Sequence, residues 1–266
     1  MRVAKGFNRT VPFHWAGGKK WMADIIGRYL PSNINRLLIP FLGRGDYLRL
    51  IRNMGVEAPA LASDIHPWLV AAHCGIRQDP GEVVRLLKGH QAMHSSDHFI
   101  RVRDAFSLEN PQSRIASDFI YMMNATYKGC LKQSKNGERT NVSACRSVSC
   151  QSAAIYAHAI ALRNTELFTE DFAVMLARAR KGDFVLNDSP SINTMGYGGI
   201  SFGKADHIRL EKGCRELDRL GANFLLTSSD DPWIRNLFQA FSIQAVEVPR
   251  TLGAKNNAKE LIVSNY

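Results

Sequence analysis

The chain has 266 residues, of which 45% are hydrophobic and 22% charged, a balance typical of a globular protein rather than a disordered one. No apolar run approaches the ~20 residues needed to cross a bilayer, and the basic N-terminal segment lacks the apolar core of a secretory signal. Five cysteines without Cys-x-x-Cys spacing argue against a disulfide framework and a cysteine-rich zinc site. We therefore expect a cytoplasmic protein built from one large domain, or from a core that carries a smaller insert.

The charge balance indicates an anionic partner. Lysine and arginine number 34 against 24 for aspartate and glutamate, which gives a formal net charge of +10 at pH 7. A field of this sign favours polyanions, and nucleic acid is the commonest of them. The alternative is a merely basic enzyme, and composition alone does not separate the two.

The first third of the chain alternates helical and strand patterns. Apolar residues at helical spacing predict a helix over 19–29. A short apolar run over 36–41 predicts a strand that ends in a glycine turn at 42–45, and a helix is expected over 46–53. A second short strand over 60–64 ends in an aspartate. Strand, glycine turn, helix and strand in this order predict the beginning of a doubly wound α/β sheet.

The middle of the chain is predicted to be a helical insert. A helix is expected to begin at Asp79, since Asp is a favoured N-cap and Pro80 suits the first helical position. Further helical patterns cover 96–106 and 117–127. The stretch 128–146 that follows is polar, basic and rich in turn residues. We interpret residues 78–148 as the insert, and residues 1–77 and 149–266 as the core that surrounds it.

The α/β pattern then resumes. A helix is predicted over 172–180 and a strand over 183–188. Helices over 206–220 and 231–241, and strands over 223–228, 243–248 and 260–264, complete the pattern. Ligands of open α/β sheets bind at the carboxyl ends of the strands, which here carry residues 41–45, Asp64 and Asp188.

Several of these residue types suit an adenosine-bearing cofactor. Gly43 and Gly45 would let the backbone approach a ligand closely, and Asp64 could bind both hydroxyls of a ribose. Trp15 could cover an adenine ring, and Lys19 could bind a carboxylate or a phosphate. Each signal alone is weak, because a lone Gly-x-Gly is more often only a turn. Their order in an α/β frame makes the combination informative.

The ordered motifs resemble the Dam-type DNA adenine-N6 methyltransferases whose recognition domain is inserted between the second-strand acid and the catalytic motif. The opening Lys-Trp-Ala-Gly-Gly-Lys of that family falls on 14–19, its Glu-Pro-Phe-x-Gly-x-Gly on 39–45 and its Ala-Asp-Ile on 63–65. Its catalytic Asp-Pro-Pro-Tyr falls on 188–191, and its closing strand on 260–266. The resemblance spans nearly the whole chain. It implies a Rossmann-like methyltransferase sheet, S-adenosylmethionine as cofactor, and double-stranded DNA with a flipped base as partner.

The resemblance also implies roles for individual residues. The positions implied to bind S-adenosylmethionine are Trp15, Lys19, Phe41, Gly43, Gly45, Asp64 and Asp188. The catalytic motif is Asp188, Ser189, Pro190 and Ser191. DNA contact is expected from the basic loop of the insert, through Lys128, Lys132, Lys135, Arg139, Asn141 and Arg146. No metal ion is expected at the site.

Two departures from the family pattern affect the expected chemistry. Ile39 stands where the family has an acid that helps to hold the methionine part of the cofactor, and Asp46 could substitute for it. In the catalytic motif, Asp188 and the Ser189 carbonyl can accept the two hydrogens of the target amine. Ser191, however, offers no aromatic face to the flipped base, and such stacking is worth ~1–3 kcal/mol.

Three hypotheses for function therefore stay open at this point. The protein is a divergent Dam-type methyltransferase with weak activity, or the same scaffold used for another DNA modification of the kind that viral genomes encode. The third hypothesis is a DNA-binding module that has lost catalysis.

One histidine cluster has a structural alternative. His90, His94 and His98 are spaced by four, as metal ligands on one helix would be. Ser95 and Asp97 between them look like the start of a new helix, so we expect no metal site there.

Overall fold

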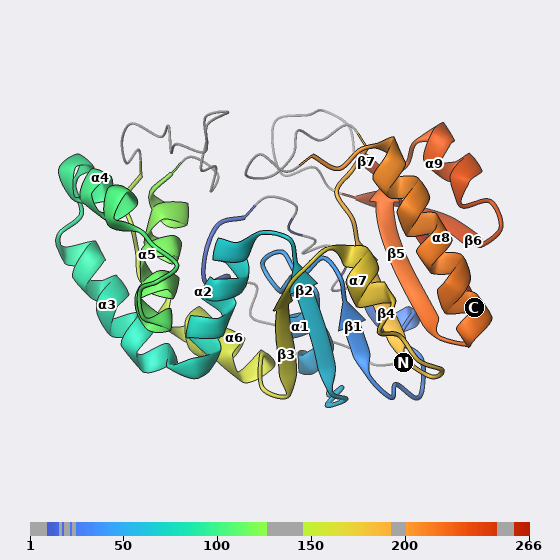
Figure 1. Ribbon diagram of the computed structural model, residues 1–266, viewed down its shortest axis with the longest axis horizontal. Helices are drawn as coiled ribbons and strands as arrows, with labels where there is room; N and C mark the ends of the chain where they lie inside the picture. The colour runs from blue at the N-terminus through green and yellow to red at the C-terminus, as the bar shows by residue number, and fades with distance from the viewer. Residues whose placement is uncertain are drawn as a thin grey trace.

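The computed structural model describes residues 10–15, 18, 22, 25–126, 146–192, 201–248 and 258–266. Its centre is a seven-stranded sheet with the strand order β3-β2-β1-β4-β5-β7-β6 (Figure 1). The strands are β1 (Leu37–Ile39), β2 (Ala60–Asp64), β3 (Thr165–Thr169), β4 (Phe184–Asp188), β5 (Asn223–Ser229), β6 (Ser242–Val248) and β7 (Ala258–Ser264). The first five pair in parallel, whereas β7 is antiparallel to both β5 and β6. The predicted Rossmann-like α/β sheet is confirmed.

Helices cover both faces of this sheet. They are α1 (Asp46–Asn53), α2 (Pro67–Gln78), α3 (Pro80–Ala92), α4 (Ser96–Ala105), α5 (Gln112–Ala125), α6 (Ser152–Ala161), α7 (Phe172–Leu176), α8 (Lys204–Leu220) and α9 (Pro232–Leu237). The sheet separates two hydrophobic cores, and successive side chains of β1 belong to different ones. Leu37 and Ile39 pack in the core with α1, α2 and α5, whereas Leu38 packs in the core with α7 and α8. All three are buried, as expected of a central parallel strand.

The helices α3, α4 and α5 lie to one side of the sheet, beyond β3 (Figure 1). Asp79 caps α3 as predicted, because its carboxylate accepts a 2.9 Å hydrogen bond from the backbone N–H of Glu82. Helix α5 is buried along most of its length and packs against α2. The assignment of residues 78–148 to a recognition domain stays a prediction.

The three histidines of this region bond to side chains. The His90 ring lies 2.8 Å from Asp118 Oδ1 and 2.9 Å from the ring nitrogen Nε2 of His98. His94 Nδ1 lies 2.9 Å from the hydroxyl of Tyr121. These bonds join α3, α4 and α5, and Ser95 caps α4 by accepting from the N–H of His98.

Two predicted helices differ from the structure, and three observed elements were not predicted. The helix predicted over 19–29 is, in its described part, a short 3-10 helix at Ile26–Arg28, where Gly27 disfavours a longer helix. The helix predicted over 172–180 ends already at Leu176. Helices α2 and α6 and strand β3 were not predicted, because α6 is apolar on most sides and β3 is a short edge strand without strict alternation. Within the described residues, no helix is both long and apolar enough to span a bilayer.

The close contact between α2 and α5 gives a stability prediction. A Cβ at Gly75 would overlap the backbone carbonyl of Gln112 and lie 2.7 Å from the Cβ of Ala116. Gly75→Ala should therefore lower the free energy of unfolding by ~1–3 kcal/mol, as overpacking does. Gly89→Ala in α3 is the matched control, since nothing lies within 4 Å of its added Cβ. It should leave stability unchanged or raise it by up to ~1 kcal/mol. Urea unfolding measures the free energy of unfolding of both variants. Equal changes in the two would contradict the close packing of α2 against α5 at Gly75.

Candidate active site

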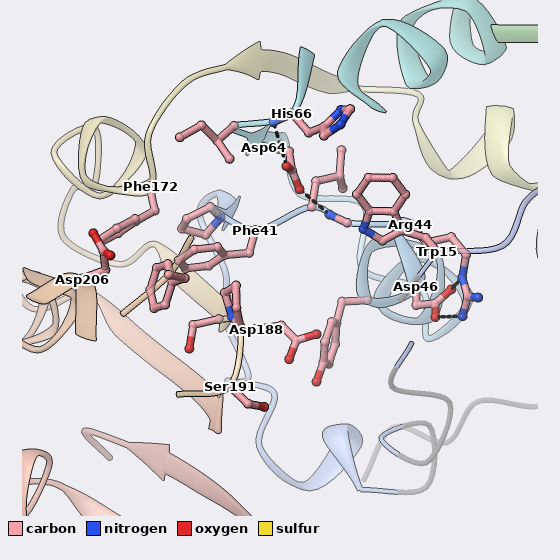
Figure 2. Close-up of a pocket in the computed structure, with 18 of the residues that line it drawn as sticks. Trp15, Phe41, Arg44, Asp46, Asp64, His66, Phe172, Asp188, Ser191 and Asp206 are labelled. Carbon is pink, nitrogen blue, oxygen red and sulfur yellow. Dashed lines mark hydrogen bonds and ion pairs between the residues drawn. The ribbon is translucent and has the colours of Figure 1, made fainter. Parts of the chain in front are cut away.

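The carboxyl ends of three adjacent strands, β2, β1 and β4, surround one cavity of about 210 Å³. Figure 2 shows the side chains of Asp64, Phe41 and Asp188 around it. The remaining lining residues used below are Trp15, Gly43, Arg44, Asp46, Tyr47, Ile65, His66, Phe172, Ser189, Pro190, Ser191 and Phe202. The strand-end location predicted from sequence is thus where the cavity lies.

The turn after β1 requires glycine at two positions. Gly43 and Gly45 have φ angles of 52° and 76°, in the left-handed region that favours glycine. A Cβ at Gly45 would also lie 2.6 Å from the ring of His158, so space as well as conformation excludes a larger residue. Gly45 is the N-cap residue of α1, which directs the first backbone N–H groups of that helix toward the turn.

Asp64 fixes this turn to the end of β2. Its carboxylate accepts a 2.9 Å hydrogen bond from the N–H of Gly43 and a 3.0 Å bond from the N–H of His66. Burial raises the pKa of the Asp64 carboxyl above its ordinary value, and the backbone N–H groups oppose that shift. A carboxylate with several acceptor sites is thereby held rigidly at the cavity.

Apolar and aromatic side chains form one wall of the cavity. Phe41 stacks on Phe172 with ring centroids 5.3 Å apart, and the ring of Phe202 meets Phe41 edge to face at 5.6 Å. Ile65 also lines the cavity and is 48% exposed, so part of its apolar surface is open to a ligand. Flat ligands suit such a wall. Sequence reasoning selected only Phe41 of this group.

A charged pair lies at the start of α1. Arg44 and Asp46 form a two-point ion pair, in which Arg44 Nε donates to Asp46 Oδ1 at 3.0 Å (Figure 2). Both residues line the cavity, whereas Ile39 is 1% exposed and packs in the core. The turn and the first residue of α1 therefore place an ion pair at the cavity, whereas the end of β1 at Ile39 places no charge there.

The carboxylate of Asp188 is held by a hydroxyl from the next strand. Thr227 on β5 donates a 2.6 Å hydrogen bond to Asp188 Oδ1, and the hydroxyl of Tyr47 lies 3.4 Å from Thr227 Oγ1. Burial and the charge of Asp188 raise the pKa of Tyr47 well above its ordinary value, so its hydroxyl stays protonated. Ser189 is 5% exposed, and its Oγ has no hydrogen-bond partner in the part of the chain that is described.

The structure brings most of the predicted site residues together. The predicted residues at the turn or the cavity are Trp15, Phe41, Gly43, Gly45, Asp64, Asp188, Ser189, Pro190 and Ser191. The positions Lys19, Lys128, Lys132, Lys135, Arg139 and Asn141 lie outside the described residues. Arg146 is described and exposed, and it does not line the cavity. The role of each residue stays a prediction.

Comparison with known proteins identifies the family. The model of the D12 class N6 adenine-specific DNA methyltransferases matches residues 15–252. The chain belongs to this family. The resemblance seen in the motifs is therefore confirmed, and the mixed seven-stranded sheet is consistent with the D12 assignment.

Curated relatives agree with the D12 assignment at low identity. The chain is 26% identical to the type II methyltransferase M1.LlaDCHI of Lactococcus lactis subsp. cremoris, over 95% of this chain and 94% of that protein. It is 26% identical to the DNA adenine methylase of Serratia marcescens, over 90% of each chain. It is also 25% identical to the DNA N-6-adenine-methyltransferase of Escherichia phage P1, over 97% of this chain and 35% of that protein.

Buried histidines around the cavity predict acid sensitivity. Burial lowers the pKa of His66 and of His73 from 6.5 to about 4. Both rings are then neutral in the folded protein, while they take up protons in the unfolded chain below pH ~6.5. Their contribution to stability is complete above that pH and should fall by about 1.4 kcal/mol per pH unit per histidine toward pH 4.

Urea unfolding between pH 7.5 and pH 5 measures this loss. His66→Gln, which removes one of the buried rings whose pKa is lowered, should reduce the slope of stability against pH. An identical slope in the variant would contradict the neutral, buried state of His66.

Proposed function

We propose that this protein transfers a methyl group from S-adenosylmethionine to the exocyclic amine of adenine in double-stranded DNA. The observation that carries the proposal is the position of Asp188, whose carboxylate is fixed in the same cavity as the glycine turn and Asp64. The proposed cofactor cradle and the proposed acceptor for the target amine therefore line one cavity. The D12 family and its methyltransferase relatives support this reaction.

The residues at the turn fit the nucleoside part of the cofactor. Gly43 and Gly45 leave the backbone open to close approach, and the Asp64 carboxylate can accept from ribose hydroxyls. Phe172 and Ile65 present apolar surface to the cavity, where a purine ring can lie. When bound, S-adenosylmethionine supplies an electrophilic methyl group.

The pair Arg44 and Asp46 fits the amino-acid end of the cofactor. That end carries a carboxylate and an ammonium group, and the guanidinium and carboxylate of the pair complement both. We propose that this pair replaces the family acid that is missing at Ile39. Asp46 then acts together with Arg44 rather than as an isolated acid.

Asp188 and the Ser189 carbonyl are proposed to accept the two hydrogens of the target amine. These acceptors orient the nitrogen lone pair toward the methyl group, and Asp188 takes up the proton that the amine loses. The hydroxyl of Thr227 keeps the Asp188 carboxylate in one orientation. Orientation of this kind supplies much of the rate gain when two reactants must meet.

Ser191 lowers the expected rate because it presents a hydroxyl where the family presents a ring. The lost stacking, ~1–3 kcal/mol, corresponds to a roughly ten- to two-hundred-fold slower reaction. DNA contact is proposed for Arg146 and for the basic positions of the segment 128–146, whose charge suits phosphate groups.

Two substitutions in the catalytic motif test the proposal. Asp188→Ala should abolish methylation, since it removes the side-chain acceptor. Ser191→Tyr should raise the rate on the order of ten- to a hundredfold, because a ring can then stack on the target base. Mass spectrometry of nucleosides from digested DNA, incubated with each protein and S-adenosylmethionine, measures both effects.

Three other results of this experiment would contradict the proposed reaction or the role of Asp188. N6-methyladenine made equally well by the unmutated protein and by Asp188→Ala would contradict the role of Asp188. A different modified base, lost in Ser191→Tyr, would show that the serine hydroxyls of this motif serve another substrate. DNA binding without modification in any variant would show a module that has lost catalysis.

A further inference from the structure

Two buried histidines contact the glycine turn at atoms that Asp64 does not contact. His73 on α2 lies with Nε2 2.8 Å from the carbonyl oxygen of Gly43, and its Nδ1 is 2.8 Å from Nε2 of His158 on α6. Both residues are 0% exposed, and their ring centroids are 4.9 Å apart. The ring of His158 also packs against Gly45, the second glycine of the turn.

The hydrogen bonds assign the proton positions of this pair. A carbonyl oxygen only accepts, so His73 Nε2 carries a proton and donates to Gly43. In the neutral ring Nδ1 of His73 is then an acceptor, and His158 Nε2 donates to it. His158 Nδ1 is left as a bare acceptor, and it has no hydrogen-bond partner among the described residues. The chain thus defines one tautomer for each ring.

The surroundings keep both rings neutral. Burial lowers the pKa of His73 to about 4, and it lowers the pKa of His158 well below its ordinary value. The charges of Arg49 and Arg44 disfavour a protonated His158 further. Asp46 faces the same turn but is already paired with Arg44. An added proton would place a cation between these arginines, together with a buried N–H that lacks an acceptor.

Gly43 is consequently held at both of its polar backbone atoms. Its N–H donates to Asp64, and its carbonyl accepts from His73, which is itself positioned by His158. A glycine with φ of 52° has wide conformational freedom, and these two bonds fix its orientation. The helices α2 and α6 therefore control the shape of a turn that belongs to neither.

We propose that His73 and His158 are positioning residues that pre-organise the turn for S-adenosylmethionine. The inference rests on the cofactor assignment of the proposed function. Without the pair, Gly43 remains bonded to Asp64 but its peptide can rotate, so part of the binding energy is spent on ordering the turn. Cofactor affinity should fall, whereas the methyl-transfer step at saturating cofactor, which depends on Asp188, should not.

Three variants separate positioning from general stability. His158→Leu removes the donor to His73, while His158→Gln keeps an amide N–H donor that does not titrate. His98→Gln is the matched control, because His98 makes a similar 2.9 Å contact with His90 in the helices beyond β3. Calorimetry with S-adenosylmethionine and with S-adenosylhomocysteine, at pH 7.5 and on folded protein, gives the dissociation constants.

We expect His158→Leu to weaken both ligands about five- to tenfold, the effect of losing one net hydrogen bond. His158→Gln should restore most of the affinity, and His98→Gln should leave it unchanged. In methylation assays, His158→Leu should raise KM for S-adenosylmethionine and leave kcat within about twofold. Equal affinity in the unmutated protein and in folded His158→Leu would overturn the proposal, as would an equal loss in His98→Gln.

Nitrogen NMR of ¹⁵N-histidine protein tests the pair without any ligand. The proposal requires His73 and His158 to be neutral at pH 6 with the proton on Nε2, and a charged ring or a proton on Nδ1 would contradict it. Because this NMR measurement uses the unmutated protein, it tests the proposal even if His158→Leu does not fold. Failure of the unmutated protein to bind either ligand, with the expected NMR signals present, would instead contradict the cofactor assignment of the proposed function.

Discussion

The hydrogen bond from the Gly43 N–H to the Asp64 carboxylate is the interaction on which the site depends. It joins the turn after β1 to the end of β2, at 2.9 Å, and it gives a buried carboxylate one of the donors that it needs. The turn can reach Asp64 because β1 and β2 are adjacent parallel strands in register from Leu37 with Ala60 to Ile39 with Ala62. The adjacency of β1 and β2 in the sheet thus fixes the position of the glycine turn through this one hydrogen bond.

On the other side of β1, a strand-end carboxylate is likewise held by a contact from a neighbouring strand. There β4 ends in Asp188, which a threonine of β5 holds in place, and the hydroxyl of Tyr47 on α1 lies 3.4 Å from that threonine's Oγ1. Tyr47 belongs to the helix that begins at the glycine turn, so the turn is linked to the Asp188 carboxylate through Tyr47 and Thr227. Ser189 and Ser191, which the resemblance aligns with the proline and the tyrosine of the family motif, take no part in this support.

Local sequence signals were sufficient for the central elements. The glycine turn, the helix at 46–53 and the strand at 60–64 each have their own pattern of turn, cap or apolar residues, and each was predicted at its observed position. His73 and His158 could not be found in this way, because α2 and α6 were not predicted and the two residues are 85 positions apart. Thr227 and Asp188, likewise, meet only through the pairing of β4 with β5. The departure at Ile39 was visible in sequence, but the two-point pairing of Asp46 with Arg44 required the folded chain.

Calorimetry of S-adenosylhomocysteine binding measures whether Asp64 and the glycine turn form the proposed cofactor cradle. The unmutated protein should bind this ligand, and Asp64→Ala, which removes the acceptor for Gly43 and for a ribose, should bind it at least tenfold more weakly, since each hydrogen bond to a charged group is worth ~1.5–3 kcal/mol. Equal affinity of the two folded proteins, or the absence of binding to the unmutated one, would contradict the account.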